Sequence, residues 1–244
     1  MPPSTNKLIS AIHKFIRKEG FNPGFLGLFI NPFYFARKGL YENIHDLAQH
    51  IRGRTLDVGC GSKPYEKLFL HSTRYVGLEM NRENKSADYY YDGSKFPFLD
   101  KEFNSIITSQ VFEHVFNPDE FLSEIHRVLI PGGMLLLTVP FVWDEHEQPN
   151  DYARYSSYGL RRLLNGHGFE IIEMRKSLND IRVIAQMMNA YIYKTTVSQY
   201  IALNYLTTLL LMAPINIAGA ILEWILPKND DLYLDNIVLC RKPM

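Results

Sequence analysis

Three acidic side chains stand near the ends of three consecutive predicted strands. Asp57 opens a turn that contains Gly59 and Gly61, Glu79 ends the second strand 20 residues after Gly59, and Asp92 ends the third. Glycine lets backbone N–H groups approach a ligand closely, and a carboxylate at the second strand end can accept both hydroxyls of a ribose. A carboxylate at the end of the third strand can contact the edge of an adenine. Because acids at three successive strand ends are hard to explain by packing, the pattern indicates a nucleoside-containing cofactor.

Short apolar strands alternate with helices from Arg54 onward, which predicts a mostly parallel sheet with both faces covered. Helices are predicted over 118–129 and 157–165, and a helix-forming stretch after Pro64 would favour an anionic group at its N-terminus. The fold expected is α/β: a Rossmann-like, doubly wound, seven-stranded sheet whose last strand forms an antiparallel hairpin with the sixth. The predicted strands are 55–58, 74–79, 87–92, 105–109, 134–139, 169–176 and 236–241.

These motifs resemble the class I S-adenosylmethionine-dependent methyltransferases, in particular the small-molecule branch called type 11. The resemblance covers about 40–176 and the last strand, although Ser62 stands where many members carry a third glycine. It implies that S-adenosylmethionine is the cofactor. By residue, it implies that the methionine half is held by Asp57, Gly59 and Gly61, the ribose by Glu79 and the adenine side by Asp92, with Gln110 covering the cofactor.

Two other classes of function remain open at this point. A dinucleotide-dependent oxidoreductase also uses a glycine-rich turn and a ribose acid, but Pro64 interrupts the region where a pyrophosphate would need free N–H groups. A protein that binds the cofactor without turnover, as a sensor or scaffold, is the other alternative.

The acceptor is expected to meet the loop at 140–155, because ligands of open α/β sheets lie beyond the carboxyl ends of the strands. Displacement at a sulfonium methyl needs a base only when the acceptor is a hydroxyl, and His146 could supply it. Arg154 could bind a phosphate or carboxylate, and Tyr155 could line the pocket. The alternative is an ordinary lid in which Arg154 pairs with an aspartate of the loop.

A metal site is considered at Glu113 and His114. Some O-methyltransferases that act on quinone precursors hold a divalent metal with an acid-x-x-acid-His cluster, and Gln110 occupies the first acid position here. Because few hard oxygen ligands remain, we predict no metal and a structural role for His114.

An apolar helical insertion at 177–235 separates the last two predicted strands, and 195–222 contains 28 consecutive residues without a formal charge or histidine. We expect a pair of helices broken at Pro214, each too short to cross a bilayer. A single crossing is excluded if the last strand returns to the sheet. The interpretation is monotopic membrane contact through 195–226, with a basic amphipathic helix over 6–18 as a second anchor. A homodimer interface and a cover over the substrate pocket are the alternatives.

The amino-acid composition limits the classes of partner that we expect for this chain. Lysine plus arginine and aspartate plus glutamate balance at 26 each, so the chain lacks the basic field that binds nucleic acid. Two distant cysteines suit a reducing compartment, and we expect a cytoplasmic protein, peripheral on the cytoplasmic face of the membrane. The expected organisation is an N-terminal helical cap at 1–51, with a helix over 40–51 stopped by Gly53, and a methyltransferase domain at 52–244. The expected reaction is O-methylation of a small-molecule or lipid-linked acceptor, such as a glycan or quinone precursor.

Overall fold

The computed structural model describes residue 15 and residues 18–244, so the helix predicted over 6–18 lies almost entirely outside the described residues. Two compact units are present. The helical unit comprises Met1–Tyr41 and Leu178–Tyr233, and the sheet unit comprises Glu42–Ser177 and Leu234–Met244. This division differs from the expected boundary at 51, because the insertion and the N-terminal segment fold together rather than as separate parts.

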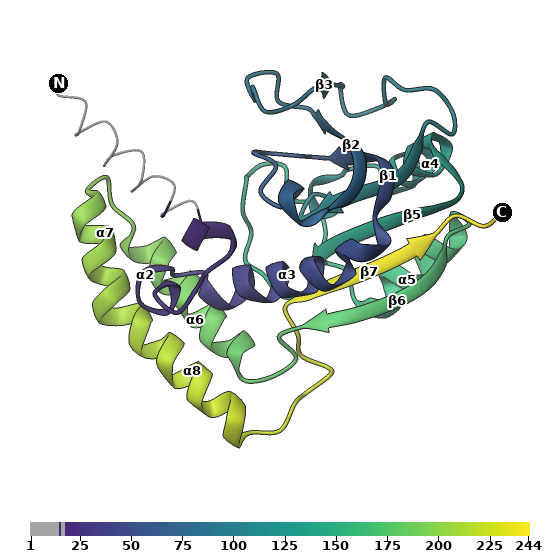
Figure 1. The fold of residues 1–244 in the computed structure, drawn as a ribbon. Coiled ribbons are helices and arrows are strands. Elements are labelled where there is room, and N and C mark those ends of the chain that lie inside the picture. Colours follow the sequence, from purple (N-terminus) through teal and green to yellow (C-terminus); the bar gives the residue numbers. More distant parts are fainter. Residues whose placement is uncertain (1–14, 16–17) are drawn as a thin grey trace, which may run out of the picture. The chain divides into compact units, whose positions relative to one another are not determined.

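The sheet unit is built on seven strands in the order β3-β2-β1-β4-β5-β7-β6 (Figure 1). Strands β1 to β5 are parallel, and β7 runs antiparallel between β5 and β6. The predicted α/β fold with an antiparallel last strand is therefore confirmed. The strands are β1 (Arg52–Val58), β2 (His71–Glu79), β3 (Tyr89–Tyr90), β4 (Phe103–Ser109), β5 (Leu129–Pro140), β6 (Glu170–Ser177) and β7 (Asp235–Arg241).

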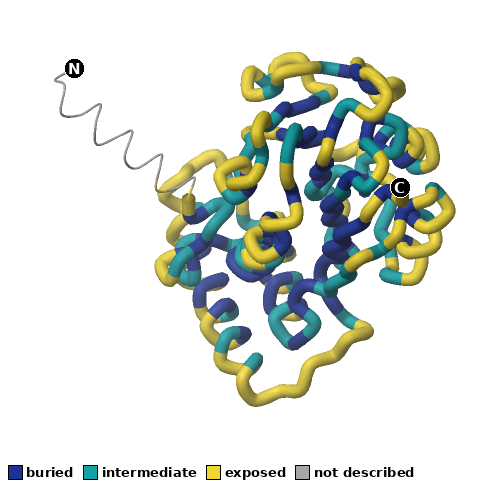
Figure 2. Tube along the Cα trace, turned by 45° about the vertical axis from the view of Figure 1, so that its right-hand side comes forward, coloured by how far each residue is buried: buried dark blue, intermediate teal, exposed yellow. Residues whose placement is uncertain are grey.

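Most residues of the central strands are buried, and Figure 2 colours the buried residues of the chain dark blue. The consecutive residues Leu135, Leu136 and Leu137 of β5 are fully buried although they point alternately to opposite faces. One face packs on α4 (Pro118–Val128) and α5 (Ser157–Gly166), whose apolar residues recur at helical spacing. Continuous apolar strands of this kind require cover on both sides.

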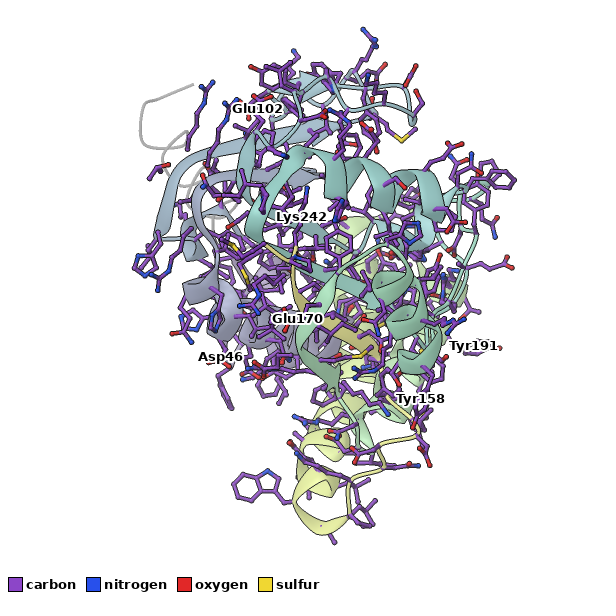
Figure 3. All side chains as sticks on the ribbon, turned by 90° about the vertical axis from the view of Figure 1, so that its right-hand side faces the viewer. Asp46, Glu102, Tyr158, Glu170, Tyr191 and Lys242 are labelled. Carbon is purple, nitrogen blue, oxygen red and sulfur yellow. The ribbon has the colours of Figure 1, made fainter. Side chains whose placement is uncertain are left out.

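An ion pair lies at the open end of the hairpin of β6 and β7. Glu170, labelled in Figure 3, lies opposite Arg241 in the register, and its Oε2 is 2.7 Å from Arg241 Nη2. Both side chains are about half exposed, so the pair adds little stability but agrees with the register.

The sequence overestimated regular structure around the first two strands. The helix predicted after Pro64 is a single 3₁₀ turn, η2 (Glu66–Leu68), because β2 already begins at His71 and leaves no room for a longer helix. No helix N-terminus is therefore available there for an anionic group. Gly53 does not end a helix either: it lies within β1 with φ 69°. The preceding helix, α3 (Tyr34–Leu47), ends in the 3₁₀ turn η1 (Ala48–His50).

The helical unit contains α2 (Gly27–Ile30), the start of α3, α6 (Arg182–Thr196), α7 (Ile201–Thr207), η4 (Thr208–Met212) and α8 (Ala213–Ile225). The expected break at Pro214 is wrong, because α7, η4 and α8 form one continuous helix of 25 residues. Pro214 lacks the N–H that an α-helix would direct at the residue four positions earlier. The π turn η4 precedes it, and Ala213 N–H donates to Thr208 O five residues back, so the helix continues.

This helix is about 37 Å long at 1.5 Å per residue, more than the ~30 Å of a hydrocarbon core. Among the described residues it is the one helix long and apolar enough to cross a membrane. Each half is about as short as predicted, but the two halves form one helix, so their separate lengths no longer limit its span. Since β7 returns to the sheet, a single crossing still conflicts with the fold.

A buried polar network lies inside the helical unit. Asn216 of α8 donates to the carbonyl oxygens of Leu28 and Asn31, at 3.0 and 3.3 Å, and accepts from Asn189 of α6 at 2.8 Å. Asn189 and Asn216 are fully buried. The two amides therefore tie three segments of the unit together.

We expect Asn216→Ala to lower the free energy of unfolding by about 2–3 kcal/mol, because it leaves buried donors and acceptors without partners. Urea unfolding followed by circular dichroism measures the loss. Asn165→Ala, at an exposed site near the end of α5, is the control and should change stability by less than about 0.5 kcal/mol. Equal stability of the two variants would contradict this role of the network.

Candidate functional site

The glycine turn after β1 needs its glycines for geometric reasons. Gly59 has φ 71°, and a Cβ atom there would lie 2.4 Å from Val111 Cγ2. Gly61 has φ 48°, with open space around the position of its missing Cβ. A clash with Val111 excludes a side chain at position 59. At Gly61 no side chain covers the backbone, so the turn is open to a ligand there.

Glu79, at the carboxyl end of β2, contacts this turn directly. Its Oε2 accepts from Gly61 N at 3.1 Å and from Asn84 Nδ2 at 3.5 Å, and its Oε1 accepts from Met80 N at 2.9 Å. Asn84 also donates to Gly61 O at 2.7 Å. Sequence reasoning missed Asn84, since an isolated asparagine in a polar loop carries no signal. The predicted ribose acid and the predicted methionine turn are thus brought together.

Asp57 is the buried acid of the site. It is 6% exposed and accepts a hydrogen bond from Tyr75 Oη at 2.7 Å. Burial raises its pKa to about 7, although the Tyr75 hydrogen bond opposes the rise. Burial makes the ionised form of this carboxyl group unfavourable. A cationic ligand nearby would favour that form.

The raised pKa predicts how stability depends on pH. A folded-state pKa of about 7 against an ordinary value of 3.8 means that the folded protein binds a proton more readily than the unfolded chain. The contribution of Asp57 to stability is therefore full below about pH 4 and falls by roughly 1.4 kcal/mol per unit until about pH 7. We expect Asp57→Asn to be more stable than wild type at pH 8 and to lose this slope. Urea unfolding from pH 5 to 8 measures it, and parallel curves for the two proteins would contradict it.

Asp92 and Gln110 also follow strand ends. Asp92 is exposed and accepts from Ser94 Oγ at 2.6 Å and from Ser94 N at 3.1 Å, which lowers its pKa. Gln110 adopts φ 56°, and its Nε2 donates to Asp235 Oδ1 at 3.2 Å and to Thr138 Oγ1 at 3.3 Å. Both residues stand at the same edge as Glu79, because the carboxyl ends of parallel strands share an edge.

Arg154, in the loop after β5, holds that loop together. Its guanidinium donates to both carboxylate oxygens of Asp151, at 2.6 and 2.7 Å, and to Asp144 O at 2.8 Å. The Arg154 hydrogen bonds lower the pKa of Asp151 to about 2. This is the arginine–aspartate pair that the sequence left open as an alternative, and a role of Arg154 toward the acceptor stays a prediction.

His146 and Tyr155 lie in the same loop. Asp151 Oδ2 accepts from His146 N at 2.9 Å and lies 3.4 Å from His146 Nδ1. Burial, and then the neighbouring His114, lower the pKa of His146. Tyr155 stacks on Phe112, with ring centroids 4.9 Å apart and an interplanar angle of 23°. These side-chain contacts add to the backbone hydrogen bonds that Tyr152 N and Ala153 N donate to Glu113 O at 2.9 and 3.2 Å.

Glu113 is the site residue whose role the sequence did not reveal. It lies in the 3₁₀ turn η3 (Phe112–His114) and is fully buried, yet neither carboxylate oxygen accepts a hydrogen bond within the part of the chain that the structure describes. Its Oε1 lies 3.8 Å from His114 Nε2 and 3.9 Å from His146 Nε2. Burial raises its pKa to about 8. The dipeptide Glu113-His114 was visible in the sequence, but its approach to His146, 32 residues later, was not.

Comparison with known proteins identifies the family. A family model described as a methyltransferase domain matches residues 33–174, more than half of the chain. The chain belongs to the S-adenosylmethionine-dependent methyltransferases. The match includes β1 to β5, η3 and the loop with His146 and Arg154.

The individual relatives share less than a third of their residues with this chain over the matched regions. This methyltransferase is 27% identical over 163 residues to a Mycolicibacterium smegmatis protein described as a probable S-adenosylmethionine-dependent methyltransferase, covering 59% of this chain and 62% of that one. It is 30% identical over 113 residues to a fatty-acid O-methyltransferase of the same organism, covering 41% of each. The methyltransferase thus spans from under half to about three-fifths of these relatives.

A solved structure supports the fold alone. The cyclase SpnF superposes with a TM-score of 0.58 and 20% identity, covering 84% of this methyltransferase and 81% of that chain. The predictions of family, fold, enzyme class and S-adenosylmethionine as cofactor are confirmed by these comparisons, while the role of each site residue remains a prediction.

Proposed function

We propose that this methyltransferase transfers a methyl group from S-adenosylmethionine to a hydroxyl of a small, lipid-linked acceptor at the cytoplasmic face of a membrane. The observation that carries the proposal is the combination of an open glycine turn tied to Glu79 with an exposed apolar helix in the same chain. The first suits a nucleoside cofactor, and the second suits an acceptor that resides in a bilayer.

The cofactor-binding part of the proposal assigns the methionine half to the turn beside Asp57, the ribose to Glu79, and the adenine side to Asp92, with Gln110 covering the cofactor. Buried Asp57 supports this, because its pKa is raised to about 7 by burial and a sulfonium nearby would favour its ionised form. The leaving group of the cofactor is already activated, so the protein mainly aligns the reactants and excludes water.

Proton removal is assigned to His146. Burial lowers its pKa, so the imidazole is neutral near pH 7 and able to accept the proton of an attacking hydroxyl. Arg154 positions His146 indirectly, because it fixes Asp151, which in turn accepts from the His146 backbone N–H. Tyr155, stacked on Phe112, would form an apolar wall of the acceptor site.

Membrane contact is assigned to an apolar stripe on the long helix. Exposed apolar side chains recur there every three to seven residues, and the helix carries no charged side chain before Glu223. The buried side of the helix faces the network of Asn189 and Asn216, so the stripe is the opposite side. We define the apolar stripe as Leu203, Leu206, Leu210, Ile217, Ile221 and Trp224.

The test uses the full chain and S-adenosylmethionine labelled with tritium on the methyl group. Membrane lipid extract and aqueous metabolite extract from the same cells are offered separately as acceptors. The proposal expects a labelled organic-soluble product that forms only when the enzyme is present. The labelled methyl group should be attached to an oxygen atom of that product. Label only in water-soluble products would overturn the lipid-linked acceptor. Cofactor binding without label in either fraction would favour a non-catalytic role.

A further inference from the structure

Three side chains from two separate segments converge next to the predicted acceptor loop. Glu113 and His114 belong to η3, and His146 belongs to the loop after β5. Their ligand-type atoms, one carboxylate oxygen and two imidazole nitrogens, all lie within 4.8 Å of one another. We call these three residues the Glu–His–His cluster.

In each ring Nε2 faces Glu113, and Nδ1 contacts the surrounding loop. His114 Nδ1 lies 2.6 Å from Asn150 O, and a carbonyl oxygen only accepts, so Nδ1 of His114 carries the hydrogen. His146 Nδ1 lies 3.3 Å from Asp144 O and 3.4 Å from Asp151 Oδ2, which are acceptors, and 3.5 Å from Arg154 Nη2, which is a donor. With the hydrogen of each neutral ring on Nδ1, both Nε2 atoms present lone pairs toward Glu113 Oε1.

A carboxylate oxygen facing two nitrogen lone pairs is unfavourable without a positive charge between them. Glu113 makes this acute, because it is fully buried and both of its oxygens lack a hydrogen-bond donor within the described residues. Buried carboxylates are normally paired, hydrogen-bonded or bound to a metal. A proton or a metal cation placed between the three groups would relieve this arrangement.

We propose that Glu113, His114 and His146 bind a divalent transition metal ion. Two imidazoles and one carboxylate, with a further position open, form a set typical of zinc and of other first-row metals, whereas magnesium prefers oxygen ligands. Imidazole rings that bind metals usually donate their other N–H to a carbonyl or carboxylate, as His114 does here to Asn150 O. Ligands at ~2.1 Å from a tetrahedral metal are ~3.4 Å apart. The 3.8 and 3.9 Å separations therefore need to close by about 0.5 Å, and the separation of the two imidazole nitrogens, which is at most 4.8 Å, by up to about 1.4 Å.

This proposal departs from the prediction made from sequence that no metal is bound. That prediction rested on Gln110 replacing an acid, and Gln110 Nε2 is indeed directed at Thr138 and Asp235. The third ligand comes instead from His146. A metal and a proton compete for the same Nε2 lone pair, so the general-base role proposed above for His146 applies only to the metal-free protein.

The test measures metal content rather than activity, so it does not depend on the proposed reaction. Untagged full-length protein is treated with a chelator, titrated with Co²⁺ and Zn²⁺, and dialysed, and bound metal is measured by mass spectrometry. The proposal expects about one equivalent per chain and visible Co²⁺ absorption bands, which Zn²⁺ removes. Glu113→Gln keeps the shape of the side chain but should weaken binding about 100-fold.

His146→Ala is the second variant, because His146 is partly exposed in a loop and its loss should leave the fold intact. It too should lose the Co²⁺ spectrum. His71→Ala is the matched control, since His71 is exposed at the amino end of β2, the opposite edge of the sheet. Wild type that retains less than a tenth of an equivalent, or His146→Ala that binds Co²⁺ like His71→Ala, would overturn the metal site.

Discussion

Glu79→Ala is expected to weaken S-adenosylhomocysteine binding about 100-fold relative to wild type. Calorimetric titration measures the two affinities. The carboxylate accepts from Gly61 N and thereby fixes the turn, and it is also the group proposed to accept the ribose hydroxyls. Each hydrogen bond to a charged group contributes about 1.5–3 kcal/mol, so the loss of two accounts for an effect of this size.

The matched control is Glu83→Ala, which removes the same charge from an exposed position four residues further along. It should bind S-adenosylhomocysteine like wild type. Circular dichroism of both variants separates a local loss of binding from unfolding. Wild-type affinity of Glu79→Ala would remove Glu79 from the cofactor site. Binding of NADH in place of S-adenosylhomocysteine by wild type would contradict the assignment of the whole site.

Polar substitution of the apolar stripe is expected to abolish binding to lipid vesicles. The triple variant Leu210→Gln, Ile217→Gln and Ile221→Gln removes three side chains that would each contribute about 1.5–3 kcal/mol when buried in lipid. The sum predicts more than a 100-fold loss of vesicle affinity. Flotation with vesicles of anionic and zwitterionic phospholipids measures the loss, and cofactor titration of the same variant should be unchanged.

The matched control places three glutamines on exposed apolar residues of the sheet unit, with Leu70→Gln, Leu99→Gln and Ile172→Gln. This control should float with vesicles like wild type. Light scattering in solution tests the remaining alternative, a homodimer interface. If wild type forms a dimer and does not bind vesicles, and the stripe variant is a monomer, the apolar stripe is assigned to that interface. Equal flotation of the two triple variants would contradict membrane contact through the stripe.

The number of strands and the mostly parallel type of the sheet could be predicted, because each strand carries a local signal. Apolar runs such as those around Leu56, Ile106 and Leu135 are bounded by turn residues, and their alternation with amphipathic helices favours a parallel sheet. Predictions failed where neighbouring elements decide the outcome. The stretch after Pro64 has helical composition, but the early start of β2 allows only a 3₁₀ turn. Pro214 usually ends a helix, and here the π turn before it allows the helix to continue.

The sequence by itself determined the fold class and the family, and it predicts the positions suited to the cofactor, because the strand ends carry acids and glycines whose spacing follows from local chain geometry. Tertiary structure alone decided what the loop after β5 does. Arg154 is paired with Asp151, and His146 reaches Glu113 across 33 residues of chain. No periodicity encodes that approach, because it depends on where β4 and β5 place their carboxyl ends. The orphaned carboxylate of Glu113 likewise becomes visible only when its burial is known.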